Sequence, residues 1–288
     1  MNLGILFAAL SAFGAATLAV FGKLALNSGL SRDNAMFYRF LLALPLLFAW
    51  SGCSEKSSRL TFPKAIRGIA LGFVGIGIMA SLFMITIAYL GANLTEIVFY
   101  TYPAFTAILS LVFLREQIRP SHWIWITVSL GSICLLLDPS RLHFNLIGVA
   151  VGLAMAVWYA GYLIVGSRFT KQMPPLRSSS FVAVGACGAF LLLSLFRGGI
   201  SLPTGMQWIW VIGLALGSTV MQFGFLYLSL ARIGASKTAF VSTLEVIFTF
   251  VLAALLLGER LTIKDAACAI GVIVSVVQLN RKANSTIS

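Results

Sequence analysis

Long apolar runs separated by short polar breaks make up almost the whole chain. The runs are continuously apolar and do not alternate with polar residues, so they predict helices and not barrel strands. Each run is about 17–25 residues long, the length that crosses ~30 Å of hydrocarbon at ~1.5 Å per residue. Ten transmembrane helices are expected, at residues 3–22, 34–50, 66–90, 94–114, 121–137, 146–165, 178–196, 206–230, 235–257 and 263–279.

The composition excludes a soluble protein. Of the 288 residues, 59% are hydrophobic and 10% are charged, and the mean hydropathy is +0.98. A soluble domain carries about a quarter charged residues, because it needs a polar surface toward water. The chain is therefore expected to be an all-α integral membrane protein, whose helices satisfy their own backbone hydrogen bonds within the lipid.

The net charge of +12 indicates topology and not a nucleic-acid partner. With a cytoplasmic amino terminus, thirteen Lys and Arg residues fall in the inner segments and six in the outer segments. This distribution follows the positive-inside rule, so both termini are expected in the cytoplasm. No loop is long enough, or basic enough in one block, to make a nucleic-acid patch.

The sequence contains no motif for metal binding, disulfide formation or catalysis. Its four cysteines are scattered without a CxxC pair, and His122 and His143 have no ligand-like spacing. The sequence also lacks HExxH, GxSxG, paired intramembrane aspartates and a nucleotide-binding glycine loop. We therefore expect neither an enzyme nor an ATP-driven pump. No cofactor is expected either, apart from the protons that a coupled transporter would exchange.

The chain contains an internal repeat with a constant offset of 143 residues. Residues 88–116 align with residues 231–259 without a gap, and ten of the 29 positions are identical. The identities include Gly91, Ala92, Thr95 and Glu116, which an apolar bias alone does not explain. Two domains of five helices each are therefore predicted, at residues 1–140 and 141–288.

Five helices in each half have a structural consequence. Because the number is odd, the second half must enter the membrane from the opposite side, so the repeats are expected to be inverted. Inverted repeats are a recurrent build of secondary transporters, which bind their substrates near the midplane between the halves. A duplicated scaffold without transport activity is the alternative. The first helix is part of the repeat and lacks a preceding basic region, so we do not expect a cleaved signal peptide.

Three groups of residues point to one family. They are Tyr102-Pro103-Ala104-Phe105-Thr106 with Leu114-Arg115-Glu116, Leu244-Glu245-Val246 with Gly258-Glu259-Arg260-Leu261-Thr262, and Tyr38-Arg39-Phe40. These segments resemble elements of the EamA-type module of the drug/metabolite transporter superfamily, and the resemblance extends over the whole chain. Val246 stands where the family usually has proline, and Phe13 stands in a region that often carries tryptophan.

The resemblance implies a ten-helix exporter of a bacterial inner membrane, with both termini in the cytoplasm. Its expected substrates are amino acids, related metabolites, or amphiphilic and toxic small molecules, moved by alternating access. Proton antiport and facilitated diffusion both remain open as energetic schemes. A lipid or lipid-linked flippase and an uncoupled facilitator or importer are the alternative functions. The expected partners are a small-molecule substrate and the lipid bilayer, and a homodimer stays open.

Glu245 is the residue that we expect to carry the transport chemistry. It falls near the middle of the predicted ninth helix, where a carboxylate is costly unless it faces the protein interior, a partner or water. Such a group can exchange a proton, anchor a substrate ammonium, or serve as a structural carboxylate bonded between helices. Ser242 and Thr249 share its helix face at i−3 and i+4, and Tyr102 is its repeat mate.

Three further charged residues are candidates for a role in transport. The guanidinium of Arg39, about a turn and a half into the second helix, can bind a carboxylate of a substrate or of Glu245. It can also snorkel to the interface or lock two helices together. Glu116 and Glu259 recur just past the fourth and ninth helices, where we expect them to pair with neighbouring basic residues as turn or gate residues.

Aromatic residues in the middle of three predicted helices can line a binding site. An aromatic wall with a few polar groups suits an amphiphilic or aromatic substrate, although such residues more often belong to a core. The candidates are Phe99, Tyr100 and Tyr102 on the fourth helix, Trp158, Tyr159 and Tyr162 on the sixth, and Gln222 and Phe225 on the eighth. Glycines four residues apart, such as Gly213 and Gly217, are expected to pack helices instead.

Overall fold

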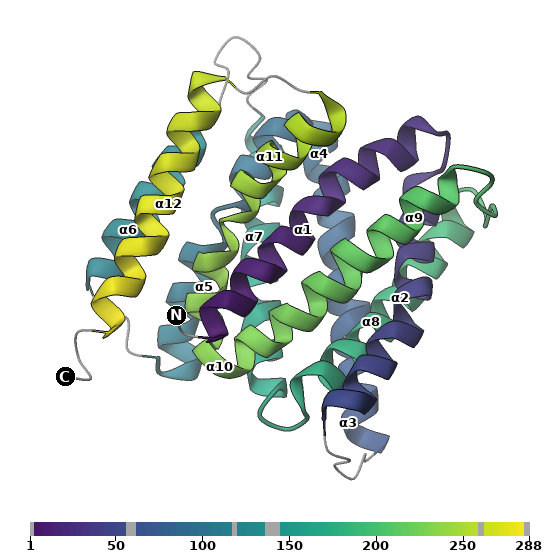
Figure 1. Cartoon of the computed structure of the whole chain (residues 1–288), viewed down its shortest axis with the longest axis horizontal. Coiled ribbons are helices and arrows are strands. Elements are labelled where there is room, and N and C mark those ends of the chain that lie inside the picture. Colours follow the sequence, from purple (N-terminus) through teal and green to yellow (C-terminus); the bar gives the residue numbers. More distant parts are fainter. Residues whose placement is uncertain (1–2, 56–61, 117–119, 136–144, 259–261, 285–288) are drawn as a thin grey trace.

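The described part of the molecule is helical throughout. The computed structural model describes residues 3–55, 62–116, 120–135, 145–258 and 262–284, and within these ranges no strand is present (Figure 1). The predicted all-α fold is confirmed.

The helices follow one another in the same order in both halves. The first half contains α1 (Leu3–Asn27), α2 (Arg32–Ser54), a continuous helix of α3 (Phe62–Ala70), the π-helical η1 (Leu71–Ile76) and α4 (Gly77–Phe99), then α5 (Tyr102–Leu109) with η2 (Ser110–Leu114), and α6 (Pro120–Cys134). The second half contains α7 (Leu146–Phe169), α8 (Pro175–Arg197), a continuous helix of α9 (Gln207–Ala215), the π-helical η4 (Leu216–Met221) and α10 (Gln222–Ser242), then α11 (Glu245–Leu257) and α12 (Ile263–Asn284).

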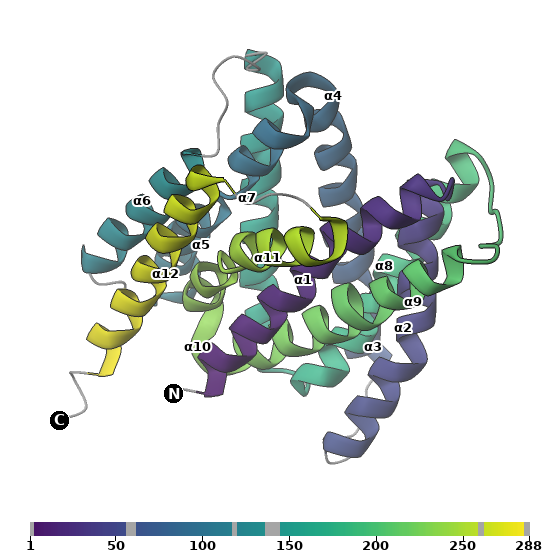
Figure 2. The ribbon, with the colours of Figure 1, turned by 45° about the horizontal axis from the view of Figure 1, so that its top comes forward.

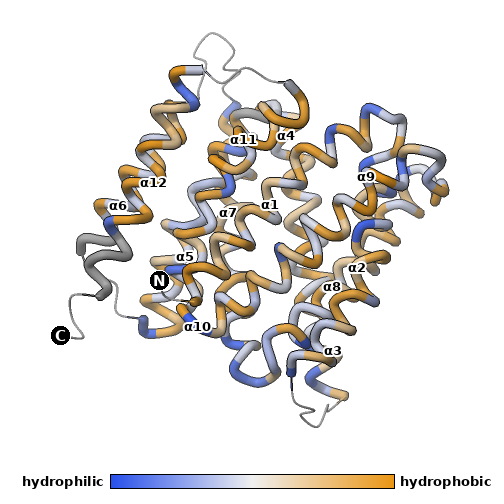
Figure 3. Tube along the Cα trace, viewed as in Figure 1, coloured by the Kyte–Doolittle hydropathy of each residue, from blue (hydrophilic) through white to orange (hydrophobic). Residues whose placement is uncertain are grey.

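Seven helices of the described chain are long and apolar enough to cross a membrane. They span Leu3–Asn27, Arg32–Ser54, Phe62–Gly91, Leu94–Leu114, Leu146–Phe169, Pro175–Arg197 and Gln207–Ser242, and Trp123–Cys134 and Glu245–Leu257 are shorter apolar helices. Large apolar side chains such as Val112, Leu255 and Ile263 are 65%, 75% and 89% exposed, and apolar residues recur along the length of the helices (Figure 3). Such a surface needs lipid as its solvent, so the chain is a multi-pass membrane protein, whereas the count of ten spans stays a prediction.

The two halves are interleaved in space. The main helix contacts join α1 to α10 and α11, α2 to α8, α4 and α5 to α7, and α6 to α12, so each contact pairs a helix of the first half with one of the second. In the order of the helices, α1, α4 and α5 of the first half correspond to α7, α10 and α11 of the second half. The α1–α10 and α1–α11 contacts therefore have equivalents in the α7–α4 and α7–α5 contacts. In both views of the ribbon, α6 and α12 lie side by side at one end of the molecule (Figure 2).

Breaks in the helical geometry recur at the same offset as the sequence repeat. Each half has a glycine with positive φ, then a two-residue turn within the following apolar segment, and then a left-handed residue at the end of that segment. The pairs, each 143 residues apart, are Gly91 and Gly234, Tyr100-Thr101 and Thr243-Leu244, and Arg115 and Gly258.

Glycines on the helix faces let backbones approach closely, as the small-residue spacing predicts. A Cβ atom added at Gly72 would overlap the backbone carbonyl of Val182 on α8, and one added at Gly217 would overlap the side chain of Thr17 on α1. These glycines pack the bundle and belong to no polar site.

Candidate functional site

Tyr102 and Glu245 each begin a half-helix directly after a tight turn. In the second half, the N–H groups of Thr243, Leu244 and Val246 donate to carbonyls three residues earlier, at 3.2, 3.1 and 3.2 Å. The predicted ninth helix is therefore not continuous, and Glu245 is the first residue of α11 instead of the midpoint of one long helix. The N–H groups of the first turn of α11 are bonded as well, because those of Ile247 and Phe248 donate to the Leu244 carbonyl at 3.0 and 3.1 Å.

The turn forms with and without a proline. In the first half Pro103 lies at the start of α5, where its missing N–H costs no helical hydrogen bond. Val246 occupies the equivalent position in the second half, and the same turn is present there. The departure from the family's usual proline therefore leaves the local geometry intact.

Aromatic rings from α4, α5 and α7 gather beside Glu245. The ring centroid of Phe99 lies 5.1 Å from that of Tyr102 and 5.2 Å from that of Tyr159, and the rings of Tyr102 and Tyr159 are 4.9 Å apart. Tyr100 adjoins Phe99 at 6.1 Å. The Glu245 carboxylate lies within electrostatic range of all three tyrosine hydroxyls. We call these five residues the tyrosine–carboxylate cluster.

A second carboxylate, Glu96, faces the same cluster. It interacts electrostatically with Glu245 and with Tyr100. Glu96 comes from the last turns of α4 in the first half, so each half contributes one carboxylate. Glu96 was not among the predicted site residues. Its charge inside the predicted fourth helix is the signal that would have found it.

One side of the cluster is packed and the other is accessible. Tyr102 is 2% exposed, and its hydroxyl donates to the carbonyl of Ala239 at 3.4 Å and adjoins Ser242. Glu96 is exposed. The half-buried members are Phe99, Tyr100, Tyr159 and Glu245. The cluster can therefore present aromatic faces and carboxylates to a molecule lying against it.

A buried tyrosine pair extends the cluster toward α10. The rings of Tyr159 and Tyr162 stack at 5.7 Å, and the Tyr227 hydroxyl donates to the Tyr162 hydroxyl at 3.2 Å. Both hydroxyl groups are buried, so each satisfies the other. Tyr227 was not predicted, because nothing in the sequence distinguishes it from an ordinary core aromatic.

Arg39 and Gln222 lie apart from the tyrosine–carboxylate cluster. The Nη1 atom of Arg39 donates to Ser218 Oγ at 3.0 Å, and its guanidinium lies 4.6 Å from the ring centroid of Phe40. Gln222 follows Ser218 by one helical turn. Arg39 and Glu245 both lie in the described part of the chain, and they form no ion pair. The expectation that the Arg39 guanidinium binds the Glu245 carboxylate is therefore wrong for this structure.

Trp158 and Phe225 contact other parts of the bundle. Trp158 donates its Nε1–H to the Gly75 carbonyl of η1 at 3.0 Å, which joins α7 to the π-helical segment. Phe225 stacks on Phe7 of α1 at 5.6 Å. Thr249 lies one turn beyond Glu245 on α11 and is half-buried.

The predicted gate residue Glu116 reaches the second half. A Cβ atom added at Gly234 would meet the Glu116 carboxylate, so this side chain lies against the turn that follows the long part of α10. Its repeat mate Glu259 lies outside the described residues.

Comparison with known proteins identifies one family twice in the chain. The EamA-like transporter family matches residues 2–138 and again residues 146–281. The uncharacterized transporter YcbK of Bacillus subtilis (strain 168) is 24% identical over 272 residues, which cover 90% of this chain and 86% of that protein. A Rickettsia felis protein named S-adenosylmethionine uptake transporter is 24% identical over 267 residues, which cover 90% and 87%. A solved crystal structure matches 99% of both chains with a TM-score of 0.83 at 15% identity, which shows a shared fold.

Proposed function

The chain belongs to the EamA-like transporter family of the drug/metabolite transporter superfamily, and from this premise we propose that it is a secondary transporter that exports small organic molecules by alternating access. It is a membrane transporter by family; the direction, the substrate and the coupling are our proposal. We expect it in a bacterial inner membrane with both termini in the cytoplasm. The expected substrates are amino acids, related metabolites, or amphiphilic and toxic compounds.

The observation that carries this proposal is the convergence of both halves on the tyrosine–carboxylate cluster. Glu245 begins a half-helix of the second half, and the aromatic rings of Phe99 and Tyr102 flank the equivalent break in the first. Discontinuous helices that meet between two repeats are where secondary transporters bind substrates and coupling ions. A packed scaffold has no need for accessible carboxylates at this position, because buried or membrane-embedded charges are costly.

The chemistry of the cluster favours a substrate with a positive charge on an apolar body. Glu245 and Glu96 attract a cation, and the faces of Tyr100 and Tyr159 can bind it through cation–π contacts. A substrate ammonium group fits this description. The Rickettsia felis relative is named for S-adenosylmethionine, which carries a positively charged sulfonium group.

Glu245 also offers a route to proton coupling. When a bound cation leaves, the carboxylate would remain in the membrane interior without a counter-charge, which is costly. A proton taken up on the side where the cation was released neutralises the carboxylate, and it leaves on the opposite side when the next substrate cation binds there. One cation then moves outward for each proton that moves inward, which is antiport.

The symmetry of the helix contacts supports alternating access. Exchange of the two halves maps the helix contacts onto one another, and the same backbone breaks recur in both halves. We therefore propose that the repeats are inverted, and that the segments around Gly91 and Gly234 move when the protein passes between inward-open and outward-open states.

Flux through proteoliposomes tests this function. The probes are labelled amino acids, S-adenosylmethionine and tetraphenylphosphonium, each with and without an imposed pH gradient. The variants are Glu245→Gln and, as a control tyrosine variant outside the cluster, Tyr89→Phe. Gradient-driven flux that is lost in Glu245→Gln and kept in Tyr89→Phe is the expected result. Equal, gradient-independent flux in all three proteins would make the protein a facilitator. Absence of flux for every probe would direct the next assay to lipid translocation.

Uptake is the second candidate direction, and the name of the Rickettsia felis relative favours it. The same proteoliposomes decide between the two directions once the protein has been inserted in one orientation. Faster flux from the cytoplasmic face under an opposing proton gradient supports export. Faster flux toward that face supports import.

A further inference from the structure

Arg39 is a buried positive charge that has no ion pair with a carboxylate of the described residues. Arg39 is 5% exposed and lies in the interior between α2 and η4. Its guanidinium has five N–H donors, and the structure shows one hydrogen bond from it, to Ser218. Arg32, which also carries a positive charge, acts on it electrostatically. An arginine that serves to lock helices is normally paired, because an unpaired buried charge is costly.

Arg39 and two residues on the helix that it contacts have unsatisfied polar atoms. Arg39 Nε, Thr219 Oγ1 and Gln222 Oε1 are buried and have no hydrogen-bond partner within the described chain. Thr219 follows Ser218, and Gln222 lies one turn further along the same helix, so the three polar residues share one stretch of helix beside Arg39. Buried polar groups without partners in a native fold call for an explanation, such as a bound molecule.

The local backbone has a second unusual feature. Ser218 and Thr219 belong to the π-helical segment η4, and Gln222 follows directly after it. π-helical segments are rare and are frequent at functional sites. In the equivalent segment η1, Gly75 occupies the position of Ser218, and its carbonyl is bonded to Trp158. The two halves have therefore diverged at this position, and the second half alone has the polar residues.

We propose that Arg39, Ser218, Thr219 and Gln222 form a second binding subsite, which takes a carboxylate of a transported molecule. This proposal rests on the proposed transport function and narrows its substrates to molecules with both a cationic group and a carboxylate. The planar guanidinium can bind a carboxylate through two parallel hydrogen bonds, one of them from Nε. The hydroxyl of Thr219 and the amide of Gln222 supply the remaining polar contacts.

The two subsites are joined by aromatic contacts. Phe40, next to Arg39, packs on Phe223 at 5.4 Å, and Tyr227 lies one turn beyond Phe223. The hydroxyl of Tyr227 bonds to Tyr162, which stacks on Tyr159 of the tyrosine–carboxylate cluster. Ser218 and Tyr227 are nine residues apart, a rise of about 13 Å along a helix. A single α-amino group and its carboxylate are too close together to reach both subsites, so an elongated zwitterion fits better.

Thermal unfolding of the purified protein in lipid nanodiscs tests the subsite without relying on transport. The probes are 4-guanidinobutyrate, which is too short to reach both subsites and so tests the carboxylate subsite by itself, and agmatine, which has an ammonium group where 4-guanidinobutyrate has its carboxylate. Acetate and chloride, at matched ionic strength, report binding of a free anion. The variants are Arg39→Gln and Ser218→Ala, with Arg39→Lys retaining the charge where Arg39→Gln does not fold.

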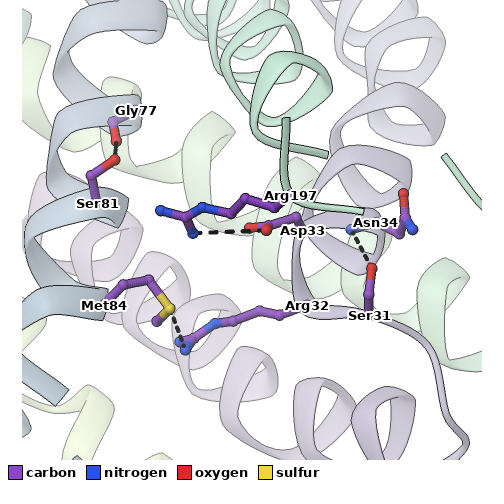
Figure 4. Close-up of polar contacts among 8 residues, drawn as sticks. All are labelled: Ser31, Arg32, Asp33, Asn34, Gly77, Ser81, Met84 and Arg197. Atoms are coloured by element: carbon purple, nitrogen blue, oxygen red, sulfur yellow. Dashed lines mark hydrogen bonds and ion pairs between the residues drawn. The ribbon is translucent and has the colours of Figure 1, made fainter. Parts of the chain in front are cut away.

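Arg32→Gln is the matched control. Arg32 lies two turns before Arg39 on α2, where its Nη1 approaches Met84 Sδ at 3.2 Å and its neighbour Asp33 pairs with Arg197 at 3.8 Å (Figure 4). Replacement of Arg32 should leave agmatine unaffected and should weaken 4-guanidinobutyrate much less than Arg39→Gln does, because Arg32 acts on Arg39 through its charge and donates no hydrogen bond to the subsite. We expect Arg39→Gln to weaken binding of 4-guanidinobutyrate at least tenfold and to leave agmatine unchanged. Ser218→Ala should weaken 4-guanidinobutyrate several-fold.

Each outcome decides one of the two proposals. Equal binding of 4-guanidinobutyrate by the wild type and Arg39→Gln, or no stabilisation of the wild type by this probe, makes Arg39 a structural residue and overturns the subsite. If acetate or chloride stabilises the protein as much as 4-guanidinobutyrate does, the site binds any small anion. That result overturns the proposal that the site takes the carboxylate of a transported molecule. Carboxylate-specific binding without any flux in proteoliposomes keeps the subsite and overturns the transport function.

Discussion

Gly91 and Gly234, 143 residues apart, adopt the same backbone conformation, with φ/ψ of 72°/171° and 78°/178°. This region of φ/ψ space is open to glycine and strained for every other residue. Both glycines follow the long helix that contains a π-helical segment, so each marks the point where the chain turns into the next apolar segment. The duplication therefore preserved a backbone requirement as well as a sequence.

The surroundings of the two glycines differ, which makes them a matched pair for mutation. Alanine at either position should cost about 1–3 kcal/mol of stability through backbone strain. At Gly234 the added Cβ would also collide with the Glu116 carboxylate, whereas at Gly91 nothing in the described chain lies within 4 Å of it. We expect Gly234→Ala to lower the unfolding midpoint more than Gly91→Ala does. Glu116→Ala should recover part of the difference; equal midpoints would show that the Glu116 contact is unimportant.

The sequence predicted the all-α membrane fold, because lipid leaves few ways to bury an apolar run of this length. The breaks at Gly91 and Gly234 coincide with predicted helix boundaries. The turns before Tyr102 and Glu245 were both missed, with and without a proline, because the residues of each turn fit a helical pattern. Apolar periodicity does not report a turn that keeps helical φ and ψ values.

The site was predicted in part, and the reason lies in how its members come together. Glu245, Tyr102 and Tyr159 were chosen as polar or aromatic residues at mid-helix depth, and the structure gathers them. Trp158 met the same criterion but faces Gly75. Residues next to each other on a helix point in different directions, and which of them meets a neighbouring helix depends on packing between the halves.

The buried hydroxyl pair of Tyr162 and Tyr227 gives a stability prediction. Replacing either tyrosine with phenylalanine leaves the other hydroxyl buried without its partner, which should cost about 1–3 kcal/mol. The double variant removes both groups and should cost less than the sum of the two single changes. Reversible unfolding in mixed micelles measures the cycle. Strict additivity would show that the two hydroxyls do not depend on each other.

Two glycines on α8 test the close approach of the helix formed by α3, η1 and α4. A Cβ atom at Gly185 would overlap the carbonyl of Ile69, whereas one at Gly188 would lie 3.6 Å from the ring of Phe73, an ordinary contact. Gly185→Ala should therefore destabilise the protein by about 1–3 kcal/mol through overpacking. Gly188→Ala should be neutral or stabilising by up to about 1 kcal/mol, because alanine favours the helix. The order of the two unfolding midpoints is the measurement, and the reverse order contradicts the packing described for α8.

Replacement of Trp158 should lower the stability of the protein and leave substrate binding unchanged. Its indole N–H is the partner of the Gly75 carbonyl, so Trp158→Phe should cost about 0.5–1.5 kcal/mol. The KM for a transported probe should stay within about twofold of wild type, because the side chain contacts η1 instead of the tyrosine–carboxylate cluster. Tyr159→Leu, one residue along α7, is the comparison variant, and we expect it to raise KM because it removes an aromatic face from the cluster. A rise in KM for Trp158→Phe as large as that for Tyr159→Leu would show that Trp158 contacts the substrate.

The two carboxylates of the cluster should have unequal roles, since Glu245 is half-buried beside three tyrosines and Glu96 is exposed. If both attract the substrate cation, Glu96→Gln should raise KM for a cationic probe several-fold and keep the response to a pH gradient. Glu245→Gln should abolish that response, because an amide cannot exchange a proton. If Glu96 acts only through Glu245, the double variant should have the same KM as Glu245→Gln. If each carboxylate contacts the cation, the fold-increase in KM of the double variant should be the product of the fold-increases of the two single variants. Flux in proteoliposomes at several gradients separates these outcomes. Loss of the gradient response in Glu96→Gln with its retention in Glu245→Gln would assign proton exchange to Glu96.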